Sequence, residues 1–197
     1  MKLLDAVATE VVVCKKCPLW ETRRNAVPGE GSPKSKIVCI GEAPGRSEDI
    51  QGRPFVGAAG KLLTQLLSCI GLSREDVFIC NIVKCRPPRN RAPSPAEVEA
   101  CTPYLDRQIN AIKPKIIVTL GHHSTTCVFS KTQLPFSSIT RVRGKSSDTA
   151  ILGRRVTVFP TLHPAAALYN GEYRKQLTED FRMLRGIAKE KGIIKSS

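Results

Sequence analysis

Short apolar runs alternate along the chain with segments of helical periodicity. Four runs rich in Ile and Val predict buried strands, at 36–42, 77–83, 114–121 and 154–164. Apolar residues at helical spacing predict helices at 58–72, 94–112 and 172–192. The helix at 94–112 begins with Ser94 as its cap, Pro95 in the first turn and Glu97 completing a capping box. Pro103 predicts a disturbance or an early end of that helix.

The order of these elements predicts the fold class. Strands that alternate with helices favour a parallel sheet with helices on both faces, and strand cores made almost entirely of Ile and Val fit burial on both sides. We expect residues 1–197 to form a single domain, because 197 residues lie within the usual range for one. No apolar run approaches the roughly 20 residues of a membrane helix. The first residues lack a signal-peptide layout, so we expect a cytoplasmic protein without membrane association.

Polar side chains follow three of the predicted strands. Glu42 lies in the turn GEAPG (41–45), Asn81 ends an apolar run, and His163 lies in TLHP after the last strand. Taken alone, Asn81 could cap a turn and His163 could be an ordinary near-core histidine. Ligands of open parallel sheets bind outside the carboxyl ends of the strands. A carboxylate, an amide and an imidazole that meet there predict a hydrolytic or base-reading site.

The charge of the chain is strongly positive. It has 31 Lys and Arg against 17 Asp and Glu, a net charge of +14, with a pI near 9.7. Such a field attracts polyanions. Nucleic acid is therefore the first candidate partner and an anionic membrane surface the second. A basic enzyme without a polyanionic partner is the alternative.

The cysteines predict a metal or cluster site rather than disulfides. The chain is long and has no export signal, whereas disulfide frameworks belong to short secreted chains. Cys14 and Cys17 form C-x-x-C, and with Cys85 and Cys101 they make a set of four. Four thiolates suit structural zinc and a [4Fe–4S] cluster equally well; base rates favour zinc, and scattered buried thiols are the alternative. Four others lie in apolar patterns and are expected in the core: Cys39, Cys69, Cys80 and Cys127.

Five motifs together carry a family resemblance: C-x-x-C-P-L (14–19), GEAPG (41–45), GRPFVGAAG (52–60), NIVKCRPP (81–88) and HPAA (163–166). From about residue 14 to residue 184 the chain resembles the family 4 uracil-DNA glycosylases, iron–sulfur enzymes of archaea and thermophilic bacteria. The resemblance implies a three-layer α/β/α sandwich around a short, mainly parallel four-stranded sheet. It also implies that the set Cys14, Cys17, Cys85 and Cys101 holds a [4Fe–4S] cluster with a structural role.

The implied activity is DNA repair: flipping uracil out of DNA and hydrolysing its N-glycosidic bond to leave an abasic site. A sister group that binds uracil-DNA covalently has Gln where Ala43 stands here, and its loop differs from PPRNRAPSP (87–95). This sequence is therefore similar to the turnover enzymes. A uracil-DNA or damage-binding module without turnover is the alternative, which the retained Glu42 and His163 disfavour. A zinc-dependent nucleic-acid-binding protein is a third.

The resemblance implies a role for each site residue. Phe55 stacks on the uracil ring, and Asn81 reads its O4 and N3–H edge. Glu48 blocks the methyl group of thymine. His163 donates a hydrogen bond to O2 as negative charge develops there. Glu42 orients the water and offsets the positive charge of the sugar.

The turn GEAPG, with Gly41 and Ala43, also aims backbone amides at the base. Arg86, Arg89 and Arg91 are expected to contact DNA phosphates, as is a second basic cluster of Arg141, Arg143 and Lys145. Leu168 is the candidate wedge that fills the gap left by the flipped base. The run ALYN (167–170) stands where the family more usually has leucine followed by arginine. The partner implied is single- or double-stranded uracil-containing DNA. We expect a monomer, with a sliding clamp as a candidate protein partner.

Overall fold

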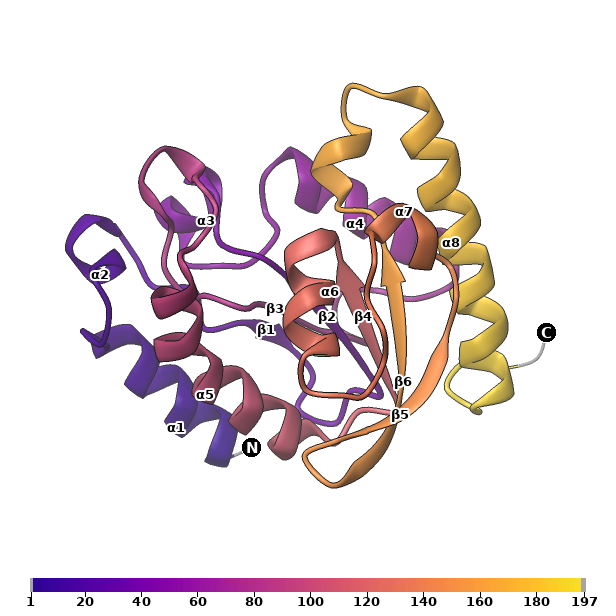
Figure 1. The fold of residues 1–197 in the computed structure, drawn as a ribbon, viewed down its shortest axis with the longest axis horizontal. Helices are drawn as coiled ribbons and strands as arrows, with labels where there is room; N and C mark the ends of the chain where they lie inside the picture. The colour runs from indigo at the N-terminus through magenta and orange to yellow at the C-terminus, as the bar shows by residue number, and fades with distance from the viewer. Residues whose placement is uncertain (1, 196–197) are drawn as a thin grey trace.

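One mixed sheet organises the computed structural model, which describes residues 2–195 (Figure 1). Its strands lie in the order β1-β3-β2-β4-β6-β5. The inner strands β3, β2, β4 and β6 are parallel, and the edge strands β1 and β5 pair antiparallel. The strand bounds are β1 Glu30–Gly31, β2 Ile37–Gly41, β3 Phe78–Asn81, β4 Ile116–Leu120, β5 Ser147–Ile151 and β6 Arg154–Thr161.

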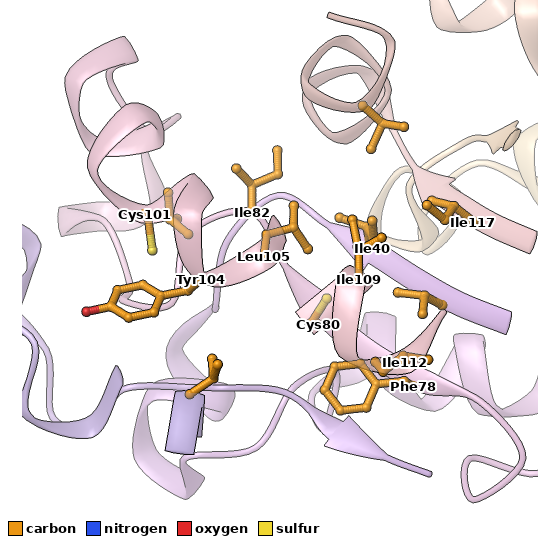
Figure 2. Close-up of a cluster of buried hydrophobic side chains, with 14 of the residues drawn as sticks. Ile40, Phe78, Cys80, Ile82, Cys101, Tyr104, Leu105, Ile109, Ile112 and Ile117 are labelled. Atoms are coloured by element: carbon orange, nitrogen blue, oxygen red, sulfur yellow. The ribbon is translucent and has the colours of Figure 1, made fainter. Parts of the chain in front are cut away.

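Helices cover both faces of this sheet. Side chains alternate between the faces along each strand, so that on β2 Val38 and Ile40 pack on one side and Ile37 and Cys39 on the other. Helices α1, α5 and α6 cover the first side, part of which Figure 2 shows, and α4 and α8 cover the second. The helix bounds are α1 Lys2–Val13, α2 Leu19–Thr22, α3 Arg46–Gln51, α4 Ala58–Cys69, η1 Pro88–Asn90, α5 Pro95–Ile112, α6 His122–Phe129, α7 Ile139–Val142, η2 Pro164–Ala167 and α8 Gly171–Glu190.

The predicted α/β/α architecture is confirmed, but the sheet has six strands and not four. The four predicted strands are its parallel core. The two additional strands lie at the edges of the sheet. They are less buried than the inner strands, so their sequences lack the continuous apolar run that marks a buried strand. β1 is only two residues long, and β5 (SDTAI) begins with three polar residues and is buried only at its last residue, Ile151.

Helix α5 runs unbroken from Pro95 to Ile112, so the predicted disturbance at Pro103 is wrong. Pro103 lacks the N–H that would bond the carbonyl of Glu99, and both residues are exposed. The carbonyl of Glu99 is therefore accessible to solvent, which can take the place of the lost hydrogen bond. The predicted capping box is confirmed: the Ser94 hydroxyl accepts from the Glu97 N–H, and the Glu97 carboxylate accepts from the Ser94 N–H.

The four cysteines expected in the core divide into two groups. Cys39 and Cys80 are fully buried inside β2 and β3. Cys127 is half-buried, and Cys69 is exposed at the end of α4, so the prediction is wrong for Cys69. Among residues 2–195, no helix has the length and apolar character needed to cross a membrane.

Candidate functional site

The carboxyl ends of the parallel strands border a cavity of about 340 Å³. Gly41 ends β2, Asn81 ends β3, and His163 follows the end of β6 by two residues. The cavity is lined by most of the residues predicted from the sequence: Glu42, Ala43, Glu48, Phe55, Asn81, Arg91 and His163. The structure thus brings together a carboxylate, an amide and an imidazole from three separate strands.

Gly41, which precedes the lining residue Glu42, leaves room for the side chains of two other lining residues. A Cβ at position 41 would overlap the Asn81 amide oxygen and would lie 2.6 Å from Cζ of Phe55. Real Cβ contacts are never this short. The absence of a side chain at Gly41 therefore allows the Asn81 amide and the Phe55 ring to lie side by side in the cavity wall.

The amide of Asn81 is buried without its full set of hydrogen bonds. Asn81 is 1% exposed, and its Oδ1 has no partner in the part of the chain that the structure describes. Its main-chain carbonyl accepts a bond of 2.7 Å from Nζ of the buried Lys84. Buried polar atoms are nearly always paired, and an orphan needs a specific explanation. A ligand N–H in the cavity would supply the missing partner.

Phe55 has a backbone conformation that few residues adopt. Its φ is +50°, in the left-handed region, and such strain persists only where the surroundings enforce it. Arg74 donates to the carbonyls of both Pro54 and Phe55, at 2.7 and 3.0 Å. On the other side, Gly60 packs so closely on the Phe55 carbonyl that any side chain there would overlap it. These contacts fix the Phe55 ring, which is 6% exposed, at the cavity wall.

His163 is held as a neutral imidazole with a defined tautomer. The N–H of Ala165 donates to Nδ1 of His163 at 3.1 Å, so Nδ1 carries the lone pair and Nε2 carries the proton. Burial lowers the pKa of His163 to about 4, and the opposing effect of Glu48 is smaller. The ring lies 5.7 Å from that of Phe55, centre to centre. At neutral pH His163 is therefore a hydrogen-bond donor through Nε2.

Glu42 and Glu48 occupy different environments in the same cavity. The Glu42 side chain is 29% exposed, and one of its oxygens lies 4.0 Å from Nε2 of His123. The carboxylate of Glu48 instead accepts three backbone hydrogen bonds, from Gly45 at 3.1 Å and from Val56 and Gly57 at 2.9 and 2.8 Å. Glu48 ties the turn 41–45 to the loop that carries Phe55, whereas Glu42 is free to contact a ligand or water.

The three arginines of the 86–91 loop differ in their contacts. Arg86 donates to the side chain of Asn90 at 2.7 Å, and Arg89 is exposed on the turn η1. Arg91 pairs through two hydrogen bonds with Glu97, at 2.6 and 2.8 Å. This pairing lowers the pKa of Glu97 to about 2. Arg91 thus anchors the loop to α5 at the edge of the cavity.

The second predicted basic cluster does not act as one group. Arg141 and Lys145 are exposed, but Arg143 pairs with the buried Asp180, at 2.7 Å. The guanidinium of Arg143 is occupied by a buried carboxylate, so its contact with DNA phosphates stays a prediction. Leu168 lies just beyond η2, half-buried against the core that α4 and α8 cover.

The four cysteines of the predicted ligand set line one small cavity between α1, α5 and the 84–85 segment. Burial raises the pKa of the Cys17 and Cys85 thiols, and that of Cys101 to about 11. Arg23 donates to Sγ of Cys85 at 3.1 Å, and the N–H of Lys84 donates to Sγ of Cys101 at 3.3 Å.

This donor set fits a group that takes four sulfur ligands, because N–H donors to sulfur are typical of iron–sulfur sites. Within residues 2–195, no three His, Cys, Asp or Glu side chains are arranged closely enough for one metal ion. The four thiols that line this cavity are the candidate ligands for zinc or for an iron–sulfur cluster.

Sequence reasoning missed three residues that support the site. Arg74 lies in a polar turn, 19 positions from Phe55, and nothing local marks it. Lys84 follows an apolar strand, where a fully buried lysine carries no pattern of its own. His123 lies in the first turn of α6, a helix that the apolar periodicity did not predict. Only the fold brings these side chains to their partners.

The chain is similar to known proteins over nearly its whole length. The family model described as Uracil DNA glycosylase superfamily matches residues 28–184. A type-4 uracil-DNA glycosylase of Sulfurisphaera tokodaii is 60% identical over 95% of this chain and 86% of its own length. One from Saccharolobus solfataricus is 57% identical over 98% and 90%, and one from Thermotoga maritima is 45% identical over 97% of both. The chain therefore belongs to the uracil DNA glycosylase superfamily and, within it, to the type-4 uracil-DNA glycosylases.

Proposed function

We propose that this protein flips uracil out of DNA and hydrolyses its N-glycosidic bond, leaving an abasic site for repair. The observation that carries the proposal is the buried Asn81 amide oxygen, which lacks a partner among residues 2–195 in a cavity also lined by Phe55 and His163. The cavity, about 340 Å³, lies at the lower end of the usual range for small-ligand sites. A base within a stacked duplex cannot enter such a cavity, so the nucleotide must be extruded.

Asn81 distinguishes uracil from cytosine in this proposal. Its Oδ1 accepts the N3–H of uracil and its Nδ2 donates to O4. Cytosine presents an unprotonated N3 and an amino group at these positions, so both contacts are mismatched. Sites built around such hydrogen bonds reject the wrong base by orders of magnitude, because the buried amide is then left unpaired. Phe55 stacks on one face of the base and so supports it while Asn81 reads its edge.

Glu48 is our candidate for the wall that excludes thymine. Three backbone N–H donors hold its carboxylate, so it cannot rotate away from a methyl group without losing them. Ala43 and the backbone of Gly41 complete the turn beside it. Glu48 thus acts through a fixed position rather than through its charge.

His163 and Glu42 carry the chemical step. As the C1′–N1 bond breaks, its electron pair leaves with uracil, and Nε2–H of His163 donates to the O2 atom where negative charge collects. The oxygen of a water molecule bonds to C1′, and one water proton is finally transferred to the released base. Glu42 orients that water and offsets the positive charge on the sugar.

The basic loop 86–91 brings the DNA backbone to the cavity. Arg89 is exposed on this loop, so it is open to contact with a phosphate. Arg91 is already paired with Glu97 and contributes mainly by fixing the loop. These contacts position the DNA without reading its sequence.

We propose further that Cys14, Cys17, Cys85 and Cys101 hold a [4Fe–4S] cluster. Such a cluster would serve here as a covalent brace between the N-terminal segment, the 84–85 segment and α5. Cys85 directly precedes the basic loop, and Lys84 contacts Asn81. The cluster ligands are therefore placed to order both the DNA-binding loop and the base-reading amide.

Replacing Cys101 by serine should lower iron content and thermal stability together. Protein purified anaerobically should carry about four irons per chain in its wild-type form, as Cys₄ cubane sites do. Iron analysis and thermal unfolding measure both effects. Cys39→Ser is the matched control, since Cys39 is buried in β2 away from the ligand set and its replacement should leave the iron unchanged. Zinc at full occupancy in iron-replete protein would contradict the cluster assignment.

Replacing Gly41 by alanine should slow uracil release by about 10²-fold, the usual effect of displacing catalytic groups by about 1 Å. The added methyl must push away the Asn81 amide and the Phe55 ring. Single-turnover kinetics measures the rate, and circular dichroism checks the fold. Gly186→Ala is the control, because a methyl there meets no atom within 4 Å. Wild-type rates in Gly41→Ala would contradict the packing described for this wall.

The proposed function is tested by incubating the protein with a uracil-containing oligonucleotide and cleaving abasic sites with alkali. We expect strand cleavage at uracil and none at cytosine or thymine in matched oligonucleotides. Binding without cleavage, under conditions where the cluster is intact, would instead identify a uracil-DNA binding module. Cleavage at thymine as fast as at uracil would contradict the proposal that Glu48 excludes thymine.

A further inference from the structure

A second cavity, of about 440 Å³, lies between α5 and α6 beside the cavity that the base would enter. Among residues 2–195, Glu42 is the one residue that lines both cavities. Three residues that carry hydroxyl groups, Thr102, Thr126 and Ser130, line the second cavity together with His123. Glu42 therefore stands at the border between an aromatic, base-sized cavity and a more polar one.

Hydrolysis of the glycosidic bond places different demands on the two sides of the sugar. In a direct displacement at a sugar carbon, the water attacks from the face of the ring opposite the leaving group. If uracil leaves into the cavity lined by Phe55 and Asn81, the water must approach C1′ from outside that cavity. A carboxylate that orients this water must reach away from the base, and the second cavity gives Glu42 room to do so.

His123 is the one basic side chain within 4.0 Å of the Glu42 carboxylate among residues 2–195. Its Nε2 lies 4.0 Å from one of the two carboxylate oxygens. Strands β2 and β4 are neighbours in the sheet, so the turn after β2, which carries Glu42, lies beside the start of α6, which follows β4. Catalytic hydrogen bonds are often long in the free enzyme and shorten in the complex. A small rotation of either side chain would bring this pair within hydrogen-bond distance.

The first turn of α6 is held in place, which gives His123 a defined position. Gly121, just before the helix, has a φ of +95°, which glycine adopts at little cost. The buried hydroxyl of Thr125 donates to the carbonyl of Gly121 at 2.7 Å. The ring of His122 packs edge-on against that of His123, 5.2 Å from centre to centre, and lies 5.1 Å from the ring of Phe136. A side chain on such a fixed element can orient a catalytic group precisely.

We propose that the attacking water binds in the second cavity, at its border with the base cavity, and that His123 is a positioning residue that holds Glu42 toward this water. Nε2 of His123 contacts one carboxylate oxygen and leaves the other to accept a hydrogen bond from the water. Uracil leaves with the electron pair of the C1′–N1 bond, and the water oxygen bonds to C1′ from the opposite side. One water proton is finally transferred to the released base. This inference rests on the proposed function.

His123→Phe keeps a ring but removes the hydrogen-bond donor. It should slow single-turnover release of uracil about tenfold and change the affinity for uracil-containing DNA by less than about twofold, because the lost bond acts on Glu42 and not on the DNA. His123→Gln should restore most of the rate, since its amide N–H can reach the same oxygen. A wild-type rate in His123→Phe, or an affinity that falls in step with the rate, would overturn the role of His123. Arg89→Ala is the control for a lost phosphate contact, which should weaken binding and flatten its salt dependence.

A double-mutant cycle tests whether His123 acts through Glu42. In the Glu42→Ala background, adding His123→Phe should change the rate by less than about twofold, because the interaction is already absent. Full additivity of the two losses would overturn the proposal. Thr126→Leu tests the place of the water, since a larger apolar side chain fills part of the second cavity. It should slow uracil release at unchanged affinity, and a wild-type rate would show that the water lies elsewhere.

Binding of abasic-site analogues separates this inference from the proposed function, because it needs no bond cleavage. A pyrrolidine in place of the abasic sugar carries the positive charge that the sugar develops in the transition state, and tetrahydrofuran is its neutral counterpart. Wild-type protein should prefer DNA with the cationic analogue, and His123→Phe should reduce that preference by misplacing the Glu42 carboxylate. An unchanged preference in His123→Phe would overturn the role of His123. Wild-type protein that shows the His123-dependent preference but releases no uracil would overturn the proposed function alone.

Discussion

His163→Ala should slow single-turnover release of uracil by roughly 10²–10³-fold, the usual cost of removing one preorganised donor to a developing oxyanion. Most of the affinity for uracil-containing DNA should remain, because the charge that His163 stabilises appears only as the bond breaks. The structure supports this division of roles. The Ala165 N–H fixes the tautomer of the ring, so that Nε2 carries the donor proton.

The pH dependence distinguishes a neutral donor from an acid. Burial lowers the pKa of His163 to about 4, so the ring stays neutral throughout the neutral range. The ratio of wild-type to His163→Ala rate constants should therefore be constant between about pH 5 and pH 8. If the imidazolium were the working form, this ratio would fall about tenfold per unit as the pH rises above about 4.

Asn81→Ala provides the contrasting variant. It should slow cleavage too. It should also narrow the difference in cleavage rate between uracil and cytosine, because Asn81 reads the edge at which the two bases differ. Affinity is measured by fluorescence anisotropy and cleavage by quench-flow on matched oligonucleotides. If His163→Ala lost affinity in proportion to rate, or cleaved at the wild-type rate, the assignment of His163 to the transition state would fail.

Both the parallel strands and the site at their ends could be predicted from the apolar runs of the sequence. Buried strands need continuous apolar runs, and a polar residue such as Asn81 that ends a run is easily recognised. The topology of open parallel sheets then places such residues together. Glu42, Asn81 and His163 could therefore be grouped from the amino-acid sequence alone, and they line one cavity.

Other features depend on contacts that no local pattern encodes. The edge strands β1 and β5 pair through backbone groups, which any sequence provides. The strained backbone of Phe55 is held by Arg74 and Gly60, which lie on other elements. A basic side chain likewise looks the same in sequence whether it meets solvent or a buried carboxylate. Arg141 and Arg143, two positions apart, show this difference directly.

Arg143→Met should destabilise the protein by about 3–5 kcal/mol, the usual cost of removing one partner from a buried ion pair. Asp180 is fully buried, and Arg143 contacts its two oxygens at 2.7 and 3.1 Å. Thr161, at the end of β6, donates to the same carboxylate at 2.6 Å. The Asp180 carboxylate therefore joins α8 both to Arg143, just beyond α7, and to β6, the strand that leads to His163. Urea unfolding at neutral pH measures the loss.

Two variants control this experiment. Arg141→Met removes an exposed charge nearby and should change the free energy of unfolding by no more than about 0.5 kcal/mol. The double variant Arg143→Met/Asp180→Leu removes the uncompensated carboxylate as well, and it should recover much of the stability lost by Arg143→Met. If the single and double variants were equally destabilised, lost packing of the arginine stem would explain the effect instead.

The destabilisation by Arg143→Met should also depend on pH. Burial raises the pKa of Asp180 in the folded protein, and Arg143 and Thr161 oppose that rise. Without Arg143 the folded-state pKa rises further, so the folded variant binds a proton more readily than the unfolded chain. Stability then increases as the pH falls through that raised pKa toward the unfolded value of about 3.9. The difference between wild type and Arg143→Met should accordingly be largest at neutral pH and shrink in acid. A difference that is constant from pH 7 to pH 4 would show that the charge of Asp180 is not its cause.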